Sequence, residues 1–324
     1  MTKIIVNNMN SKINSKLGLS GAAFGLGLID LMKKGNELFV VSADMAKPPG
    51  LSRFMSMYPD NFYNVGIAEQ NMLGIAAGIS SEGYKSIVVA QACFVSMRSF
   101  EMMRQYMGYM GSKIIACGIA SGFALTYFGN THYSFEDLAL TRTIPGLTIY
   151  SPSDASQAIA CFKEAINDEG PVYIRFTGQL NSPIIYKDDF DFIKGKSIQL
   201  LKGNQISIFA TGSIVYNTLM AAEILMKEGI SVNLYDVHTI KPIDKEAIIQ
   251  SKESDLFVSV EEHSIIGGLG SAISDYISQN DDYPKLLKIG VNDRFSKPGD
   301  YNYLLEQNGL SPEKISQQIL SALS

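Results

Sequence analysis

Short runs of β-branched and aliphatic residues alternate with longer amphipathic stretches along most of this chain. Such alternation is typical of strand-helix units around a largely parallel sheet, because parallel neighbours need a crossover helix between them. Apolar runs predict a first set of strands at 38–42, 86–90, 114–119, 147–150 and 172–176, and a second set at 207–210, 232–235, 256–260 and 287–289. We therefore expect an α/β fold.

Helical periodicity fills the gaps between these runs. The stretch 69–81 predicts a helix that places four apolar residues on one face: Met72, Ile75, Ala76 and Ile79. Asp154, after Ser153, offers an N-cap for a helix that continues to residue 166. Two more helices are expected at 217–227 and 270–277.

A polar and irregular stretch at 178–202 separates the two sets of strands. It contains Pro183 and the charged run KDDFDFIKGK, and it predicts no core element. We place the domain boundary there, which divides the chain into domains of residues 1–185 and 195–324. At 46% hydrophobic content, the 324 residues include enough apolar side chains for two cores.

Charge and cysteine usage exclude several classes of protein. The 27 basic and 32 acidic residues give a net charge of -5, which provides no positive field for nucleic acid. The N-terminal segment resembles neither a signal peptide nor a membrane span. The three cysteines are widely spaced and suggest neither disulfides nor a structural metal site, so we expect a cytoplasmic protein without metal ligands of its own.

Glu69 is the residue best placed to carry chemistry. It is the single acidic residue of FYNVGIAEQNMLGIAAG (62–78), between a strand-like run and an apolar helix. A carboxyl group there is partly desolvated, and desolvation favours its neutral form. Alternatively, Glu69 is an ordinary first-turn acid that the helix dipole favours. The segment alone leaves both readings open.

Several segments resemble transketolases, in the same order along the chain. In the first half, the segment around Glu69, QACFVSMRSFEMMR (91–104) and GNTHYSFEDLALTRTIPGLTIYSPSD (129–154) resemble the pyrimidine-binding domain. In the second half, TIKPID (239–244), EEHSIIGGLGSAI (261–273) and VNDRF (291–295) resemble the transketolase C-terminal domain. The resemblance implies a thiamine-pyrimidine-binding domain with a parallel sheet, followed by a smaller α/β C-terminal domain.

The resemblance also implies a reaction and a cofactor. With thiamine diphosphate, the enzyme would move a two-carbon ketol unit from a ketose to an aldehyde or aldose acceptor. Glu69 would accept a hydrogen bond from N1′ of the aminopyrimidine, and Phe94 would stack on that ring. Gln91 falls where many relatives carry a second aromatic residue. Arg98 falls on the pocket wall, and Asp44 matches an acidic residue near the cofactor.

The three histidines have different expected roles. His132 matches a position that lines the family's substrate channel, where an imidazole can bond a ketose hydroxyl or relay a proton. His263 is interpreted as structural or interfacial because its motif lies far from the thiazolium in the family. His238, at a strand end, is interpreted as structural.

Three further positions bear on the substrate. Phe128, with Gly129, replaces an Asp-Gly pair whose Asp reads a donor hydroxyl in sugar-phosphate transketolases. Ala120 and Gly178 replace a histidine and an arginine that bind phosphate there, although Arg175 is retained. Each lost charge-assisted bond is worth roughly 1.5 to 3 kcal/mol. We expect an unusual substrate, either a sugar without a terminal phosphate or one with a bulkier group such as a nucleotide.

The chain lacks the Gly-Asp-Gly motif that opens the family's Mg2+ and diphosphate site. Its one Gly-Asp pair, Gly299-Asp300, lies in a loop near the end. The resemblance therefore implies the C-terminal subunit of a split transketolase, paired in an α2β2 assembly with an N-terminal subunit that binds diphosphate and Mg2+.

Other readings remain open. The β subunit of a 2-oxo acid dehydrogenase shares the architecture and the length. A deoxyxylulose-phosphate-synthase-like enzyme, which decarboxylates pyruvate, is a second alternative. A non-catalytic paralogue is a third, although Glu69 argues against it because its carboxyl has no other evident use.

Overall fold

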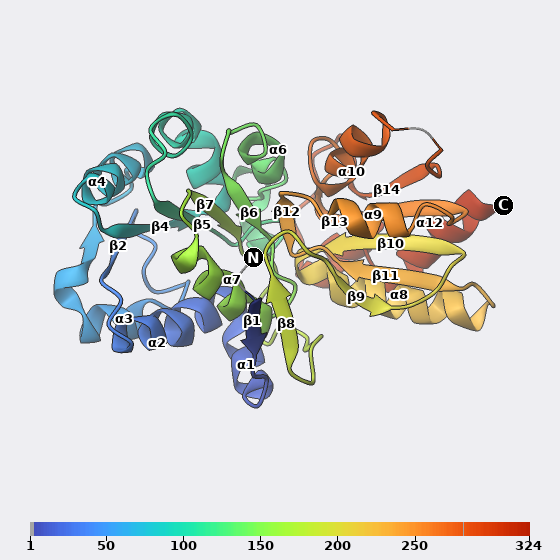
Figure 1. The fold of residues 1–324 in the computed structure, drawn as a ribbon, viewed down its shortest axis with the longest axis horizontal. Coiled ribbons are helices and arrows are strands. Elements are labelled where there is room, and N and C mark those ends of the chain that lie inside the picture. The colour runs from blue at the N-terminus through green and yellow to red at the C-terminus, as the bar shows by residue number, and fades with distance from the viewer. Residues whose placement is uncertain (1–2, 281) are drawn as a thin grey trace.

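The computed structural model of the chain describes residues 3–280 and 282–324. These residues form a seven-stranded sheet and a five-stranded sheet, which lie in the left and right halves of Figure 1. Both sheets are mostly parallel and are covered by helices, so the expected two-part α/β fold is confirmed. No helix in the described part of the chain is long and apolar enough to cross a membrane.

The seven-stranded sheet has the order β12-β6-β7-β5-β4-β2-β3, and β12 is its antiparallel member. Its strands are β2 (Leu38–Ser42), β3 (Phe62–Asn64), β4 (Lys85–Gln91), β5 (Ile114–Ile119), β6 (Thr148–Tyr150), β7 (Val172–Arg175) and β12 (Thr239–Lys241). The first set of predicted strands is confirmed as β2, β4, β5, β6 and β7.

Helices cover both faces of this sheet, as alternation along β4 shows. Ile87 and Val89 pack into one apolar core with α7, whereas Val88 and Ala90 pack into another with α4. The α-helices of this half are α1 (Ser11–Ala22), α2 (Ile29–Lys33), α3 (Ser52–Met57), α4 (Glu69–Ser81), α5 (Phe100–Met102), α6 (Asp137–Thr141) and α7 (Ala155–Asn167). Its π helices are η1 (Ala23–Leu28), η3 (Phe94–Arg98) and η4 (Met103–Tyr109), and its 3-10 helices are η2 (Pro59–Asn61) and η5 (Thr126–Thr131).

The five-stranded sheet has the order β14-β13-β10-β11-β9, with β9 antiparallel to β11. Its strands are β9 (Ile198–Leu201), β10 (Ile206–Thr211), β11 (Val232–Asp236), β13 (Leu256–Ser264) and β14 (Leu286–Val291). Its helices are η6 (Gly212–Ile214), α8 (Val215–Lys227), α9 (Lys245–Gln250), α10 (Leu269–Ile277), α11 (Tyr301–Gln307) and α12 (Pro312–Leu323). The second set of predicted strands is confirmed.

The stretch 178–202 was expected to contain no core element, and that expectation is wrong. It contributes β9 and also β8 (Phe190–Ile193), which pairs antiparallel with β1 (Lys3–Val6). Phe192 is completely buried, and its ring stacks on that of His238 at 4.1 Å between centroids. Charged residues alternate with apolar ones here because only one face of the strand is covered.

The predicted helix at 69–81 is confirmed as α4. Of its predicted apolar face, Met72 and Ala76 are buried and Ile79 packs partly buried against the core, whereas Ile75 does not. Ile75 is 36% exposed. The buried apolar residues of the helix are Met72, Leu73, Ala76 and Ala77. The difference arises because α4 is apolar on more than one side, so periodicity alone does not settle which side meets the sheet. At α7, Asp154 caps the helix as predicted and accepts a hydrogen bond from the backbone of Gln157.

The two halves of the chain are joined by more than a linker. Strand β12 comes from the second half but pairs with β6, so it extends the first sheet. Asp236, at the end of β11, accepts hydrogen bonds from Ser153, Gln157 and Tyr186. One apolar core also includes residues of both sheets, among them Tyr173 and Phe209.

Candidate active site

Most of the predicted site residues gather at the carboxyl edge of the first sheet. Glu69 is the first residue of α4, and Gln91 is the last residue of β4. Gln91 lies beside Ile119, the last residue of β5, in the parallel register, and Ala120 follows directly. The carboxyl edge of an open parallel sheet is where such folds bind ligands.

Glu69 is paired with Arg98, which also packs on Phe94. Its side chain is only 2% exposed, and Nη1 of Arg98 donates to both carboxylate oxygens at 2.8 Å. The guanidinium carbon of Arg98 lies 4.1 Å from the centre of the Phe94 ring. The planar guanidinium of Arg98 thus contacts both the buried Glu69 carboxylate and the face of the Phe94 ring.

His132 also contacts the Phe94 ring. The two rings meet edge to face, with centroids 5.5 Å apart, and the Phe128 ring lies 5.0 Å from the imidazole. Thr131 Oγ1 is 2.8 Å from His132 Nδ1. Gln91 Nε2 donates to the carbonyl oxygen of His132 at 2.7 Å, so Gln91 supports the histidine loop. The structure therefore brings together Glu69, Gln91, Phe94, Arg98, Phe128 and His132.

Asp44 lies in an exposed turn after β2 and bonds Asn64 rather than a residue of this cluster. Its carboxylate accepts a hydrogen bond from the Asn64 amide at 3.2 Å, and its backbone N–H donates to Asn64 Oδ1 at 3.0 Å. Asn64 also accepts from the backbone N–H of Gly66. Asn64 was not among the predicted site residues, although an Asn at a strand end two residues before a glycine indicates a side-chain-stabilised turn.

Ala120 and Gly178 line one cavity of about 480 Å³, which also borders Met45. Its walls come from 17–20, Met45, Pro48, 119–120, 124–125 and 176–181. Of the described residues that line it, none carries a charged side chain. The backbone N–H of Phe128 bonds the carbonyl oxygen of Leu125, a wall residue, which connects the cavity to the His132 cluster.

Backbone geometry limits what can occupy these two positions. Gly178 has a φ of +74°, and a Cβ placed on it would lie 3.0 Å from the Cβ of Ser213. Ala120 has a φ of +57°, in the left-handed region that side chains with a branched Cβ avoid. A long cationic side chain at Gly178 would require the neighbouring segment to move.

Arg175 was expected to line the substrate channel, but the structure places it elsewhere. It is completely buried, and its Nε donates to both Asp137 carboxylate oxygens at 3.1 and 2.9 Å. Its Nη2 donates to the carbonyl oxygens of Ser134 and Glu262. Since Glu262 belongs to β13, Arg175 ties the two sheets together and does not face a channel.

His238 and His263 are both completely buried. Burial lowers the pKa of His238 to about 3 and that of His263 to about 4. His263 lies 3.9 Å from Asp137 and 3.7 Å from Glu261, at the junction of the two sheets. Both histidines are neutral, enclosed groups, which agrees with the structural roles expected for them.

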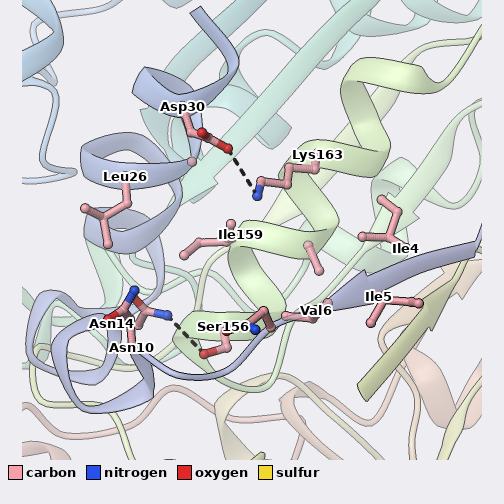
Figure 2. A pocket seen from close by; sticks show the side chains of 13 residues that line it. Ile4, Ile5, Val6, Asn10, Asn14, Leu26, Asp30, Ser156, Ile159 and Lys163 are labelled. Atoms are coloured by element: carbon pink, nitrogen blue, oxygen red, sulfur yellow. Dashed lines mark hydrogen bonds and ion pairs between the residues drawn. The ribbon is translucent and has the colours of Figure 1, made fainter. Parts of the chain in front are cut away.

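A second cavity, of about 410 Å³, lies between β1, α7 and the helices α1 and α2 (Figure 2). Asn14 donates to Ser156 across it, and Lys163 lies 3.3 Å from Asp30 at its other end (Figure 2). None of the predicted site residues lines this cavity. It is therefore not part of the candidate active site.

The cluster fits one end of thiamine diphosphate. A planar nitrogen heterocycle could occupy the place of the Arg98 guanidinium, bonded to Glu69 and stacked on Phe94. For the metal-diphosphate end, the described residues include no group of three or more His, Cys, Asp or Glu side chains that could hold a metal ion.

Comparison with known proteins matches both halves of the chain. The family model "Transketolase, pyrimidine binding domain" matches residues 20–182, and "Transketolase, C-terminal domain" matches residues 195–315. A putative transketolase C-terminal section of Methanocaldococcus jannaschii is 36% identical over 93% of this chain and 95% of its own length. A 6-deoxy-6-sulfo-D-fructose transketolase subunit of Clostridium sp. strain MSTE9 is 35% identical over 89% of each chain. A solved structure described as a split gene transketolase, inactive beta4 tetramer, superposes with a TM-score of 0.84 at 34% identity, covering 94% of this chain and 98% of that one.

Proposed function

Because this chain belongs to the transketolase family, we propose that it is the C-terminal subunit of a split, thiamine diphosphate-dependent transketolase in the cytoplasm. The reaction is the transfer of a two-carbon ketol unit from a ketose donor to an aldehyde or aldose acceptor. The observation that carries the proposal is the buried Glu69 carboxylate. It binds the planar guanidinium of Arg98, which lies over the Phe94 ring. Residues 1–185 form the pyrimidine-binding domain and residues 195–324 the C-terminal domain.

Three residues of the cluster have roles in this reaction. Thiamine diphosphate supplies the carbanion chemistry when bound. Glu69 accepts a hydrogen bond from the protonated ring nitrogen N1′ of the aminopyrimidine and holds the ring in the tautomer that can take up a proton. Phe94 fixes the plane of that ring. His132, which is half-buried beside Phe94, bonds a substrate hydroxyl or moves a proton to it.

A separate N-terminal subunit supplies the diphosphate and Mg2+ site. Two observations support this: the described residues contain no metal-ligand cluster, and apolar side chains around the site are open to solvent. Ile67 is 76% exposed, Phe128 64% and Met97 40%. A partner subunit that completes the site would cover them, in an α2β2 assembly. The related split transketolase structure, described as an inactive tetramer of β chains, is in keeping with this division.

The cavity beside Ala120 and Gly178 favours a substrate without a terminal phosphate. A phosphate dianion is stabilised by charge-assisted hydrogen bonds, and the described walls offer neutral groups. The Clostridium relative is named for a sulfo-sugar, so substrates other than common sugar phosphates occur among similar proteins. The proposed substrate is a sugar without a terminal phosphate or one with a bulkier group such as a nucleotide.

Replacement of Glu69 tests the proposed function. In the complex with the N-terminal subunit, Glu69→Gln should slow exchange of the C2 proton of thiamine diphosphate by at least about 100-fold, since a positioned acid-base group contributes about 10²–10⁴. Exchange is started by dilution into deuterium oxide, quenched with acid and measured by NMR. Glu101→Gln, on an exposed helix position, is the matched control and should exchange like the wild type. Equal exchange rates for all three proteins would refute the proposal.

A further inference from the structure

Arg98 makes both contacts that the proposed cofactor ring needs. It bonds both oxygens of Glu69 through one nitrogen, and its guanidinium carbon lies over the Phe94 ring, 4.1 Å from the ring centre. An aminopyrimidine is likewise a planar nitrogen group that donates a hydrogen bond to a carboxylate and stacks on an aromatic ring. The same carboxylate and the same ring face serve both.

We propose that Arg98 occupies the aminopyrimidine position of the cofactor-free subunit and must move away before thiamine diphosphate can bind. The inference rests on the proposed function, because it takes Glu69 and Phe94 as the pyrimidine-binding pair. It goes beyond that function by making Arg98 an intramolecular competitor of the cofactor. A wall residue that merely borders the bound ring would leave cofactor affinity unchanged or strengthen it.

Space at the site enforces the competition. Glu69 is 2% exposed, and both of its oxygens are already within 2.8 Å of Arg98 Nη1. At 4.1 Å the guanidinium is in van der Waals contact with Phe94, so a second planar group cannot stack on that face. Cofactor and Arg98 therefore exclude each other.

The burial of the Glu69 carboxylate explains why Arg98 takes the place of the cofactor ring in the cofactor-free subunit. A buried carboxylate without a partner is strongly destabilising, and an arginine pair removes that penalty while the cofactor is absent. When the cofactor ring arrives, its own N–H donor replaces the guanidinium. The buried carboxylate is then paired both in the cofactor-free subunit and in the cofactor-bound one.

Arg98 is free to leave because only its tip is engaged in the site. Its side chain is 45% exposed, and it is the last residue of η3, four residues after Phe94. Its backbone is held separately, since Gln70 Nε2 donates to the Arg98 carbonyl oxygen at 3.2 Å. Rotation of the side chain into solvent therefore leaves the backbone of η3 in place.

Cofactor binding to the complex with the N-terminal subunit tests this inference. We would measure the dissociation constant and association rate of thiamine diphosphate by calorimetry and stopped flow for the wild type, Arg98→Ala and Arg98→Lys. Arg104→Ala is the matched control, because Arg104, six residues after the end of η3, forms an exposed ion pair with Glu101. A thermal melt of each variant verifies folding.

Arg98→Ala should bind the cofactor about fivefold more tightly, which corresponds to about 1 kcal/mol, with a faster association rate. Arg98→Lys keeps the charge but cannot stack as a planar fork, so its affinity should fall between the two. Unchanged or weaker binding by folded Arg98→Ala overturns the inference and leaves the proposed function intact. If neither wild type nor variant binds thiamine diphosphate, the proposed function fails, and this inference fails with it.

Discussion

Ala120 and Gly178 show how single positions set the chemistry of the large cavity. Both have left-handed backbone conformations, and a Cβ at Gly178 would press on Ser213. Gly178 is therefore fixed as glycine by its surroundings. Ala120 is not, because the left-handed region also accepts Asn, Asp and His.

Replacement of Ala120 should change substrate preference. The wild-type complex should use an unphosphorylated aldose acceptor in preference to ribose 5-phosphate. Ala120→His adds a potential cation to a neutral wall, so kcat/KM for ribose 5-phosphate should rise by about tenfold, the value of one charge-assisted bond. Ala120→Asn has the same backbone tolerance without the charge and should show no such rise. A wild type that already prefers ribose 5-phosphate would contradict the neutral-cavity account.

Some residues of the site could be predicted from the sequence, and others could not. Glu69, Phe94 and His132 lie in ordered motifs, and the structure places them in one cluster. The pairing of Arg98 with Glu69 could not be predicted, because 29 residues separate them and only the packing of η3 against α4 brings them together. Arg175 was misplaced for a related reason: a strand-end arginine can face a cavity or the second sheet, and local sequence does not distinguish these.

At the level of elements, central strands and edge strands differed in how well sequence predicted them. Strands covered on both faces, such as β4 and β5, are continuous apolar runs and were located closely. The strands β1, β8 and β9 were missed because each is only four residues long, and β8 alternates with charge in a stretch that resembles a loop. Edge strands owe their position to partners that are distant in sequence, as the pairing of β1 with β8 shows.

Strand β8 should contribute substantially to stability in spite of its charged sequence. Phe192 is completely buried against Tyr150 and His238, so Phe192→Ala should lower the free energy of unfolding by about 3 to 5 kcal/mol. Phe295→Ala is the control, since Phe295 is 84% exposed and its removal should cost little. Urea unfolding followed by circular dichroism provides the measurement. Equal midpoints for the two variants would show that β8 is not packed as described.

At the scale of the whole molecule, the two halves act as one folded unit. Strand β12 completes the first sheet from the second half of the chain, and Arg175 connects Asp137 to the backbone of β13. Asp236 provides a third connection, from β11 to α7 and to Tyr186. A boundary drawn from composition alone does not reveal such cross-connections.

The Asp236 connection should make stability depend on pH. Burial raises the pKa of Asp236 from 3.8 to about 6, so the folded chain keeps a proton that the unfolded chain releases. The contribution of Asp236 to the free energy of unfolding is therefore fully present below about pH 4. It is lost as the pH rises to about 6, by at most about 1.4 kcal/mol per pH unit. Asp236→Asn cannot titrate and should lack this loss. Urea unfolding between pH 4 and 7 compares the two, and parallel profiles would contradict the assignment.

The central claim is that this chain carries the pyrimidine end of an active site that a second polypeptide completes. Its most direct test is thiamine diphosphate-dependent ketol transfer by the purified chain alone and after addition of an N-terminal subunit that carries the Gly-Asp-Gly motif. We predict no turnover from the chain alone and turnover from the mixture. Full activity of the chain without the second polypeptide would contradict the account.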